Sequence, residues 1–327
     1  MTMSNLLKNS VPHIVAIVVF LIVNAVYFTD QVNGKVIQAG DTISSTANQQ
    51  EIMKYYNENG ELITWTNALF GGMPTYQIRG SNPGNLIQHV EKLMFLYISR
   101  PIGYFFASML AFYIMLILLK VNPWLSLLGA VAFGLTTNNF ILFSAGHMTK
   151  IRVINYLGLL TAGVILAFRQ HRHLLGAVVF ALGFALVLYV NHIQMVYYFF
   201  LTLLIYGIIE LVWHIRNNQL PQFGKAVLYL TVAGVLAIGS SASKLWTTYE
   251  YGKDTMRGAP ILAAETGKAA SSSTTDGLEY GYATRWSNGY MDLVAGFIPG
   301  VIGGGGVTYW GANDDGTAGP AYYGAVV

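Results

Sequence analysis

A single acidic residue after the first apolar segment is the candidate with the clearest chemistry. Asp41 lies in the run Gly40-Asp41-Thr42. A carboxylate at a membrane surface can act as general base for an acceptor hydroxyl, or as an oxygen ligand for a divalent cation such as Mg²⁺ or Mn²⁺. The alternative is structural, because Asp before a helical run commonly caps the helix N-terminus. We interpret Asp41 as the catalytic candidate and, if a metal binds, as its ligand.

Basic residues recur at two later turns and in a second hydrophilic stretch. They are His147, Lys150, Arg152, His192 and Arg257. Arginine binds phosphate through two parallel hydrogen bonds and lysine binds it as a point charge, so with Asp41 these residues predict a lipid-phosphate substrate. For Lys150 and Arg152 the alternative is snorkelling from a helix end toward lipid phosphates. For His147 and His192 it is capping or interface hydrogen bonding.

Two glycine-rich aromatic stretches complete the set of candidate residues. Trp65 opens the first, which ends at Met73-Pro74, and Trp286 lies in the second, from Tyr280 to Ser287. Both tryptophans are predicted to line a substrate site. The alternative is that they belong to the aromatic belt at the membrane interface.

The composition identifies the kind of scaffold that must position these residues. Of the 327 residues, 54% are hydrophobic and only 10% are charged, against about 25% charged in a soluble domain. The chain is therefore predicted to be an all-α polytopic membrane protein. It has no cysteine, which excludes disulfides and thiolate metal sites, and its net charge of +3 does not suggest a nucleic-acid partner.

About seven apolar segments are long enough to cross a bilayer, which takes about 20 helical residues. The third is interrupted by a Thr-Thr-Asn-Asn run, which predicts a helix broken within the membrane. An interfacial helix is predicted over Leu86 to Ile98, with Glu91 on its polar face, and a polar helix over Thr42 to Tyr56. The predicted spans are Val11 to Phe28, Pro101 to Leu119, Trp124 to Phe143, Ile154 to Phe168, Leu174 to Val190, Met195 to Trp213 and Ala226 to Ser240.

These segments divide the chain into four parts. They are a cytoplasmic tip with the first span (1–28), a first large loop with interfacial helices (29–100), a six-helix bundle (101–243) and a second large loop leading into a further apolar segment (244–327). The apolar C-terminal residues suggest that the chain is the N-terminal fragment of a longer protein.

The distribution of cations predicts the orientation. Most short-loop cations fall on one side, which the positive-inside rule makes cytoplasmic. The N-terminus is then cytoplasmic and both large loops lie on the outer face, together with Asp41, His147 and His192. The cations on the cytoplasmic side are Lys8, Lys120, Arg169, Arg172, Arg216 and Lys225.

The order of these motifs resembles the bacterial YfhO-like membrane protein family, particularly its longer members from the Bacteroidetes group. The resemblance covers nearly the whole chain. It rests on Gly40-Asp41, Phe70-Gly71-Gly72-Met73-Pro74, Gly146-His147-Met148-Thr149-Lys150, Asn191-His192-Ile193-Gln194-Met195, Arg257-Gly258, Trp286-Ser287, Ile298-Pro299 and Gly303-Gly304.

That family is similar to membrane glycosyltransferases of the GT-C architecture, which take sugars from polyprenyl-phosphate carriers. The resemblance implies that Asp41 matches the acidic residue of their first outer loop and that His147, Lys150 and Arg257 contact the carrier phosphate. It also implies a bacterial cytoplasmic membrane location and a cell-surface glycan or lipid acceptor. Two departures are the shorter chain and the acidic residue expected soon after Trp286-Ser287, which here is Asp292.

Two other classes of function stay open from the sequence. A transporter or flippase for a lipid-linked sugar would use the broken third span and the polar residues within the membrane. A non-catalytic assembly protein would use its loops, including the Gly267 to Thr275 stretch, to bind a partner. The clustering of charge at the predicted outer edge favours the enzyme.

Overall fold

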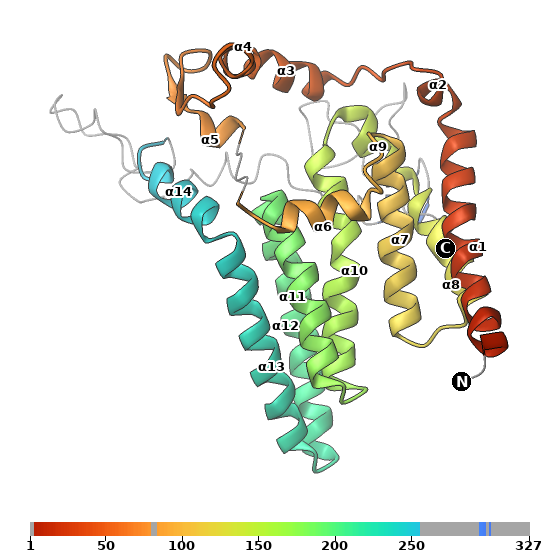
Figure 1. Ribbon diagram of the computed structural model, residues 1–327. Coiled ribbons are helices and arrows are strands. Elements are labelled where there is room, and N and C mark those ends of the chain that lie inside the picture. Colours follow the sequence, from red (N-terminus) through yellow and green to blue (C-terminus); the bar gives the residue numbers. More distant parts are fainter. Residues whose placement is uncertain (1–2, 80–83, 256–293, 299–300, 302–327) are drawn as a thin grey trace, which may run out of the picture. The chain divides into compact units, whose positions relative to one another are not determined.

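The computed structural model describes residues 3–79, 84–255, 294–298 and 301. The chain forms two compact units, Met1–Ser241 and Ala242–Val327. The described part of the second unit contains helix α14 (Ala242–Gly252) and a short turn at 294–298. All the helices discussed below belong to the first unit (Figure 1).

Apolar α-helices make up most of the first unit, which confirms the all-α polytopic membrane class. Among the described residues, six helical segments are long and apolar enough to cross a membrane, with α8 and α9 taken together, and the 17-residue α7 is apolar but shorter. The count of seven spans stays a prediction. The helices are α1 (Met3–Tyr27), α7 (Ile102–Leu118), α8 (Pro123–Gly134), α9 (Thr137–Ala145), α10 (Met148–Phe168), α11 (His173–Val190), α12 (Ile193–Arg216) and α13 (Leu220–Ser240).

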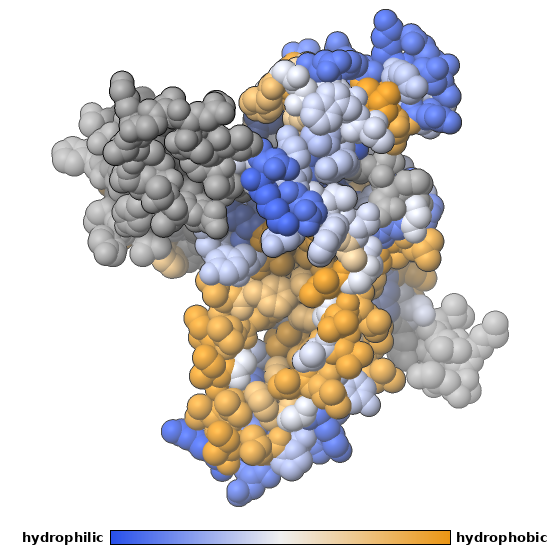
Figure 2. Space-filling model, turned by 90° about the vertical axis from the view of Figure 1, so that its left-hand side faces the viewer, coloured by the Kyte–Doolittle hydropathy of each residue, from blue (hydrophilic) through white to orange (hydrophobic). Residues whose placement is uncertain are grey.

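The chain passes back and forth between two ends of this helix bundle (Figure 1). At one end, here named the loop end, lie residues 28–79 and 84–101, the α9–α10 turn and the α11–α12 turn. The other, named the turn end, carries the short α7–α8, α10–α11 and α12–α13 connections. Figure 2 shows a hydrophobic band between hydrophilic residues at either end. Which end faces the cytoplasm stays a prediction.

The predicted break in the third span is confirmed. Helix α8 ends at Gly134 and α9 begins at Thr137. The side chain of Asn139 is buried, and its Nδ2 donates to the carbonyls of Phe133 (3.2 Å) and Gly134 (3.1 Å). A backbone break at membrane depth needs partners for the carbonyls it frees, and Asn139 supplies them from within the interrupting sequence.

Helices α10 and α11 form the centre of the bundle and pack through glycines. A Cβ on Gly163 of α10 would lie 2.6 Å from the backbone nitrogen of Phe180, and one on Gly176 of α11 would lie 2.7 Å from the carbonyl oxygen of Gly163. Lipid provides no hydrophobic drive for helices to associate, so close backbone contact at small residues must hold them together. The packing of the other helices against α10 therefore depends on this crossing.

The loop between α1 and α7 is folded from short elements. They are α2 (Thr29–Val32), α3 (Gly40–Asn48), α4 (Gln50–Asn59), the antiparallel strands β1 (Trp65–Thr66) and β2 (Met73–Pro74), α5 (Thr75–Ile78) and α6 (Ile87–Met94). The prediction of a single polar helix over Thr42 to Tyr56 is wrong, because two helices cover this stretch. Helix α3 ends at Asn48 and α4 begins at Gln50. The predicted interfacial helix is α6, which lies across the bundle (Figure 1).

One boundary differs in a way that affects the site. The fourth span was predicted to begin at Ile154, but α10 begins at Met148. Lys150 and Arg152 are therefore helical residues with fixed directions. The prediction failed because their charges mark the end of an apolar segment, whereas the helix continues for a further turn and a half beyond it.

The α10–α11 crossing gives a direct test. We expect Gly163→Ala to destabilise the protein by about 1–3 kcal/mol, because the added methyl overlaps the α11 backbone and neither helix can yield cheaply. Thermal unfolding of the detergent-solubilised protein measures this. The control is Gly207→Ala on α12, whose Cβ would meet nothing within 4 Å. Equal unfolding midpoints for the two variants would contradict the packing described here.

Candidate functional site

Asp41 contacts His147 at the loop end. The Oδ2 atom of Asp41 lies 3.0 Å from Nε2 of His147. Asp41 is in the first turn of α3, and the N-cap position is held by Ala39 without a side-chain cap. The capping interpretation of Asp41 is therefore not what the structure shows. Its side chain is 64% exposed and that of His147 is 37% exposed, so the pair contributes little stability and is open to a ligand.

The glycine between α9 and α10 allows this contact. Gly146 has a φ of +91°, and a Cβ there would lie 2.9 Å from Cβ of Asp41 and 3.0 Å from the backbone nitrogen of Thr42. It ends α9 in the left-handed conformation typical of the residue after a helix. The first turn of α3 thus packs directly on the glycine that precedes His147.

A cavity of about 710 Å³ opens beside Asp41. Its walls come from α3, α4, the start of α7 and one face of α10. Hydroxyl groups and three arginines line it together with the Asp41 carboxylate. The lining residues are Asp41, Thr42, Ser45, Thr46, Gln49, Met53, Arg79, Arg100, Tyr104, Gly146, Met148, Thr149 and Arg152.

One of the three arginines, Arg152, is already neutralised by the protein. Its Nε donates to Oε1 of Glu91 at 2.8 Å, and its Nη2 contacts Oε2 of the same carboxylate. The hydroxyl of Tyr156 donates to Oε1 of Glu91 at 3.1 Å. Arg152 therefore ties α6 to α10 and does not snorkel toward lipid. A role of Arg152 in substrate binding stays a prediction.

Glu91 corrects the interpretation of the interfacial helix. It was placed on the polar face of that helix, but its residue is only 5% exposed. It follows Ile87 by four residues and precedes Phe95 by four, so it lies on the face that packs on the bundle. The sequence signal was this i, i+4 spacing with Ile87 and Phe95, whereas the prediction assigned Glu91 to the polar face of the helix.

Sequence analysis did not identify Arg100 and Arg79, which line the same cavity. Within the described residues, no carboxylate lies at ion-pair distance from either guanidinium. Arg79 contacts Gln49 at 3.4 Å and Met53. The available signal for Arg100 was its position immediately before Pro101, at the loop-end start of α7. A cation without a carboxylate partner in a cavity is suited to bind an anion.

Lys150 and His192 lie near His147. Burial lowers the pKa of His192, and the positive charges of Lys150 and His147 lower it further. His192 is at the N-cap position of α12, outside the apolar spans. Of the predicted site residues, Asp41 and His147 are therefore in direct contact, and the charges of His147 and Lys150 act on His192.

The remaining predicted site residues are elsewhere. The indole of Trp65 packs against Gly72 in the β1–β2 hairpin, where a Cβ would come within 2.7 Å of it, and Trp65 does not line the cavity beside Asp41. Arg257 and Trp286 lie outside the described residues. No group of three or more His, Asp or Glu residues in the described part of the chain is arranged to hold a metal ion. A metal at Asp41 would take further ligands from water or substrate.

The cavity beside Asp41 is the first of a series of three, each of which shares lining residues with the next. A cavity of about 390 Å³ shares Thr42, Arg100 and Met148 with it. A third, of about 600 Å³, shares Gln31, Ile37 and Phe143 with the second. The third is lined by the aromatic side chains of Tyr27, Phe28, Phe140 and Phe143. The series therefore changes from a cavity lined by arginines to one with four aromatic side chains, which also keeps polar residues including Asp30.

The fold and these contacts define the class as a polytopic helical membrane protein with an arginine-lined cavity at one end of its bundle. Comparison with models of protein families, with curated proteins and with solved structures finds no match.

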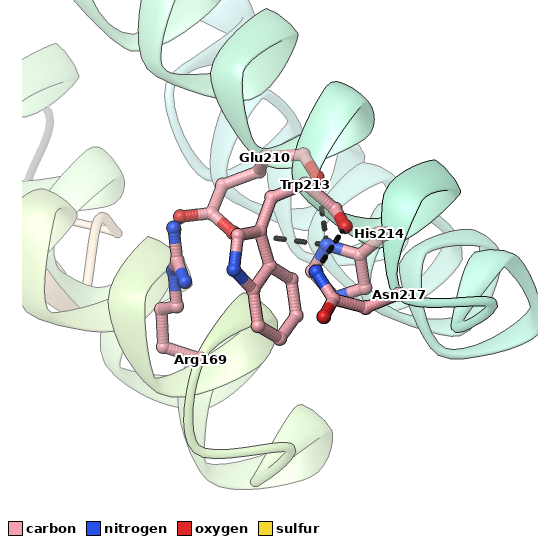
Figure 3. A network of polar contacts seen from close by, with 5 residues as sticks. All are labelled: Arg169, Glu210, Trp213, His214 and Asn217. Atoms are coloured by element: carbon pink, nitrogen blue, oxygen red, sulfur yellow. Dashed lines mark hydrogen bonds and ion pairs between the residues drawn. The ribbon is translucent and has the colours of Figure 1, made fainter.

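A second polar cluster lies at the turn end, where Figure 3 shows Arg169 reaching Glu210. The Nε of Arg169 donates to Oε1 of Glu210 at 2.5 Å, and its guanidinium lies 4.5 Å from the ring of Trp213. Glu210 and His214 are fully buried, and Nδ1 of His214 lies 2.8 Å from the carbonyl oxygen of Glu210. Of the residues in α12, only Val196, Glu210 and His214 are buried, so this cluster holds α12 in place.

We expect Gly146→Ala to separate Asp41 from His147, since the added methyl meets α3 in a conformation that already strains any side chain. Distances between spin labels on α3 and α10 would lengthen. The control Gly60→Ala has a comparable φ of +75° but nothing within 4 Å of its Cβ, so it shows the strain without the crowding. Unchanged distances in Gly146→Ala would contradict the docking of α3.

The turn-end cluster gives a second test. Arg169→Met should destabilise the protein by about 1–3 kcal/mol, because it removes the guanidinium from the buried Glu210 carboxylate and leaves only His214, 3.7 Å from Oε2, as a possible charge partner. Adding Glu210→Gln should recover much of this loss. Thermal unfolding of both single variants and the double variant measures the coupling. Additive effects would show that the pair does not hold α12.

Proposed function

We propose that this protein is a membrane glycosyltransferase that moves a sugar from a polyprenyl-phosphate carrier to a cell-surface glycan or lipid acceptor. The observation that carries the proposal is the Asp41–His147 pair at the edge of a cavity whose Arg79 and Arg100 have no described carboxylate partner. In this arrangement the two arginines would bind an anion beside the Asp41 carboxylate, which would act as the base. The proposal places this end of the bundle on the outer face of a bacterial cytoplasmic membrane.

In the proposed reaction the acceptor hydroxyl oxygen forms a bond to the anomeric carbon of the sugar, while the bond from that carbon to the carrier phosphate breaks. Asp41 takes the hydroxyl proton through its second carboxylate oxygen, while Nε2–H of His147 donates to the first and fixes its direction. The phosphate leaves with the electron pair. Arg100 and Arg79 stabilise its charge as preorganised cations.

The series of cavities supports a lipid as the donor. A phosphate beside Arg100 would lie where the first two cavities share that residue, and an apolar chain would extend toward Phe143 and Phe140. Aromatic and aliphatic side chains favour a hydrocarbon chain over water. An amphiphile with an anionic head and an apolar tail matches this change in polarity.

Transport of a lipid-linked sugar is a second candidate, favoured by the break between α8 and α9, which is a feature of transporters with discontinuous helices. The two functions differ in their products. Transfer releases the polyprenyl phosphate from its sugar, and transport moves the intact lipid. Analysis of the lipid after incubation with the protein in vesicles distinguishes them.

We expect Asp41→Asn to lower the rate of transfer about 10²–10⁴-fold, since an amide cannot accept the hydroxyl proton. The measurement is release of polyprenyl phosphate from short-chain polyprenyl-phosphate hexoses by the purified protein with envelope glycan as acceptor. Arg100→Ala should mainly raise the KM for the donor. The control is Glu58→Gln, which makes the same charge change at an exposed residue of α4. Full activity in Asp41→Asn would overturn the proposal.

A further inference from the structure

A groove runs between α11 and α13, two helices of the bundle that pack on each other. It has a volume of about 420 Å³ and is lined by aliphatic side chains and one tyrosine. The buried lining residues Ala177 and Ala233 are small, whereas larger lining side chains such as Val178 and Val232 are exposed. Both helices are long and apolar enough to cross a membrane. The groove therefore opens to the hydrocarbon of the bilayer.

The length of the groove corresponds to one leaflet. On α13 it extends from Leu228 to Leu236, which is about 12 Å at about 1.5 Å per residue. On α11 it extends from Leu174, at the turn-end start of that helix, to Ala181. One leaflet contributes about half of a hydrocarbon thickness of about 30 Å. The groove therefore follows the depth of the leaflet at the turn end and can hold a single acyl chain.

Polar side chains lie at the turn-end mouth of this groove. The Nε2 atom of His173 lies 3.1 Å from Oε1 of Gln222, and this contact joins the first turns of α11 and α13. The ring centroid of His173 lies 6.0 Å from that of Tyr229, which lines the groove. The apolar groove thus ends at a polar contact between the two helices.

Lys225 adds a positive charge at the same mouth. It precedes Tyr229 by four residues and Val232 by seven, so it shares the face of α13 that lines the groove. Arg172 directly precedes His173, and Lys225 and Arg172 are both exposed. In the described part of the chain, neither has a carboxylate at ion-pair distance. Long basic side chains at the end of a span reach the level of the lipid phosphates.

We propose that the groove between α11 and α13 binds an anionic phospholipid of the surrounding bilayer, with one acyl chain along the groove and its phosphate at Lys225 and Arg172. Any phospholipid offers hydrocarbon to the groove, but a head group with a net negative charge gains most from the two cations. A second copy packed here about a two-fold axis would bring its own Lys225 to the same mouth, and like charges disfavour such an interface. The site lies at the opposite end of the bundle from Arg100 and does not rest on the proposed function.

Photocrosslinking locates the lipid on the full chain. Phosphatidylglycerol with a diazirine in its acyl chain is added to phosphatidylcholine nanodiscs that contain the protein, and the crosslinked peptides are identified by mass spectrometry. We expect saturable crosslinks within residues 174–181 and 228–236, which unlabelled phosphatidylglycerol displaces. Phosphatidylcholine with the same diazirine chain should crosslink there without saturation. Lys225→Gln should raise the half-saturating concentration of phosphatidylglycerol about fivefold, the effect of one basic residue on an anionic lipid.

The matched control is Lys120→Gln, which makes the same change at an exposed turn-end residue outside the groove and should leave half-saturation unchanged. Ala181→Phe should abolish the saturable crosslinks, because its ring would fill the groove. Equal crosslinking by the two lipids, or equal effects of Lys225→Gln and Lys120→Gln, would overturn the proposal. A dimer that Ala181→Phe dissociates would overturn it as well, since it would show a second copy in the groove.

Discussion

The close crossing of α10 and α11 is the contact on which the rest of the first unit depends. Gly163 and Gly176 bring the two backbones together with no space for a methyl group on either. Helices in lipid gain little from burying apolar surface, so such close packing has to supply the attraction. Because α10 also packs on α7, α9, α12 and α13, its position fixes the direction of every side chain in its first turns, including those of Lys150 and Arg152.

The charges of the bundle fall into two groups by their partners. Arg152 and Arg169, at the two ends of α10, each pair with a buried carboxylate from a distant part of the sequence, Glu91 and Glu210. A buried carboxylate without its cation is strongly destabilising, so these pairs connect α6 and α12 to the centre. Arg100, by contrast, has no carboxylate partner in the described residues. The first group therefore has a structural role, and Arg100 is the cation that the proposed function assigns to the carrier phosphate.

The helices that lead to Asp41 and His147 are interrupted twice, between α8 and α9 and between α9 and α10. The interruption between α8 and α9 is satisfied by the buried Asn139, and the sharp turn between α9 and α10 is made by Gly146. The first break needs its own hydrogen-bond donors because no water is present at membrane depth. The second lets α3 approach the backbone closely. The sequence shows both breaks as polar or glycine residues within apolar segments. The contact with Asp41 adds a second reason, besides the positive φ, why Gly146 cannot carry a side chain.

The sequence by itself determined the membrane class, the approximate positions of the apolar helices and the break after Gly134, because length, hydropathy and polar interruptions are local properties of the chain. It also singled out Asp41, His147, Lys150 and His192. Only the tertiary structure decided which of them meet. Periodicity cannot show that α3 docks on Gly146 or that Glu91 neutralises Arg152, because these are contacts between residues far apart in sequence whose directions are set by packing.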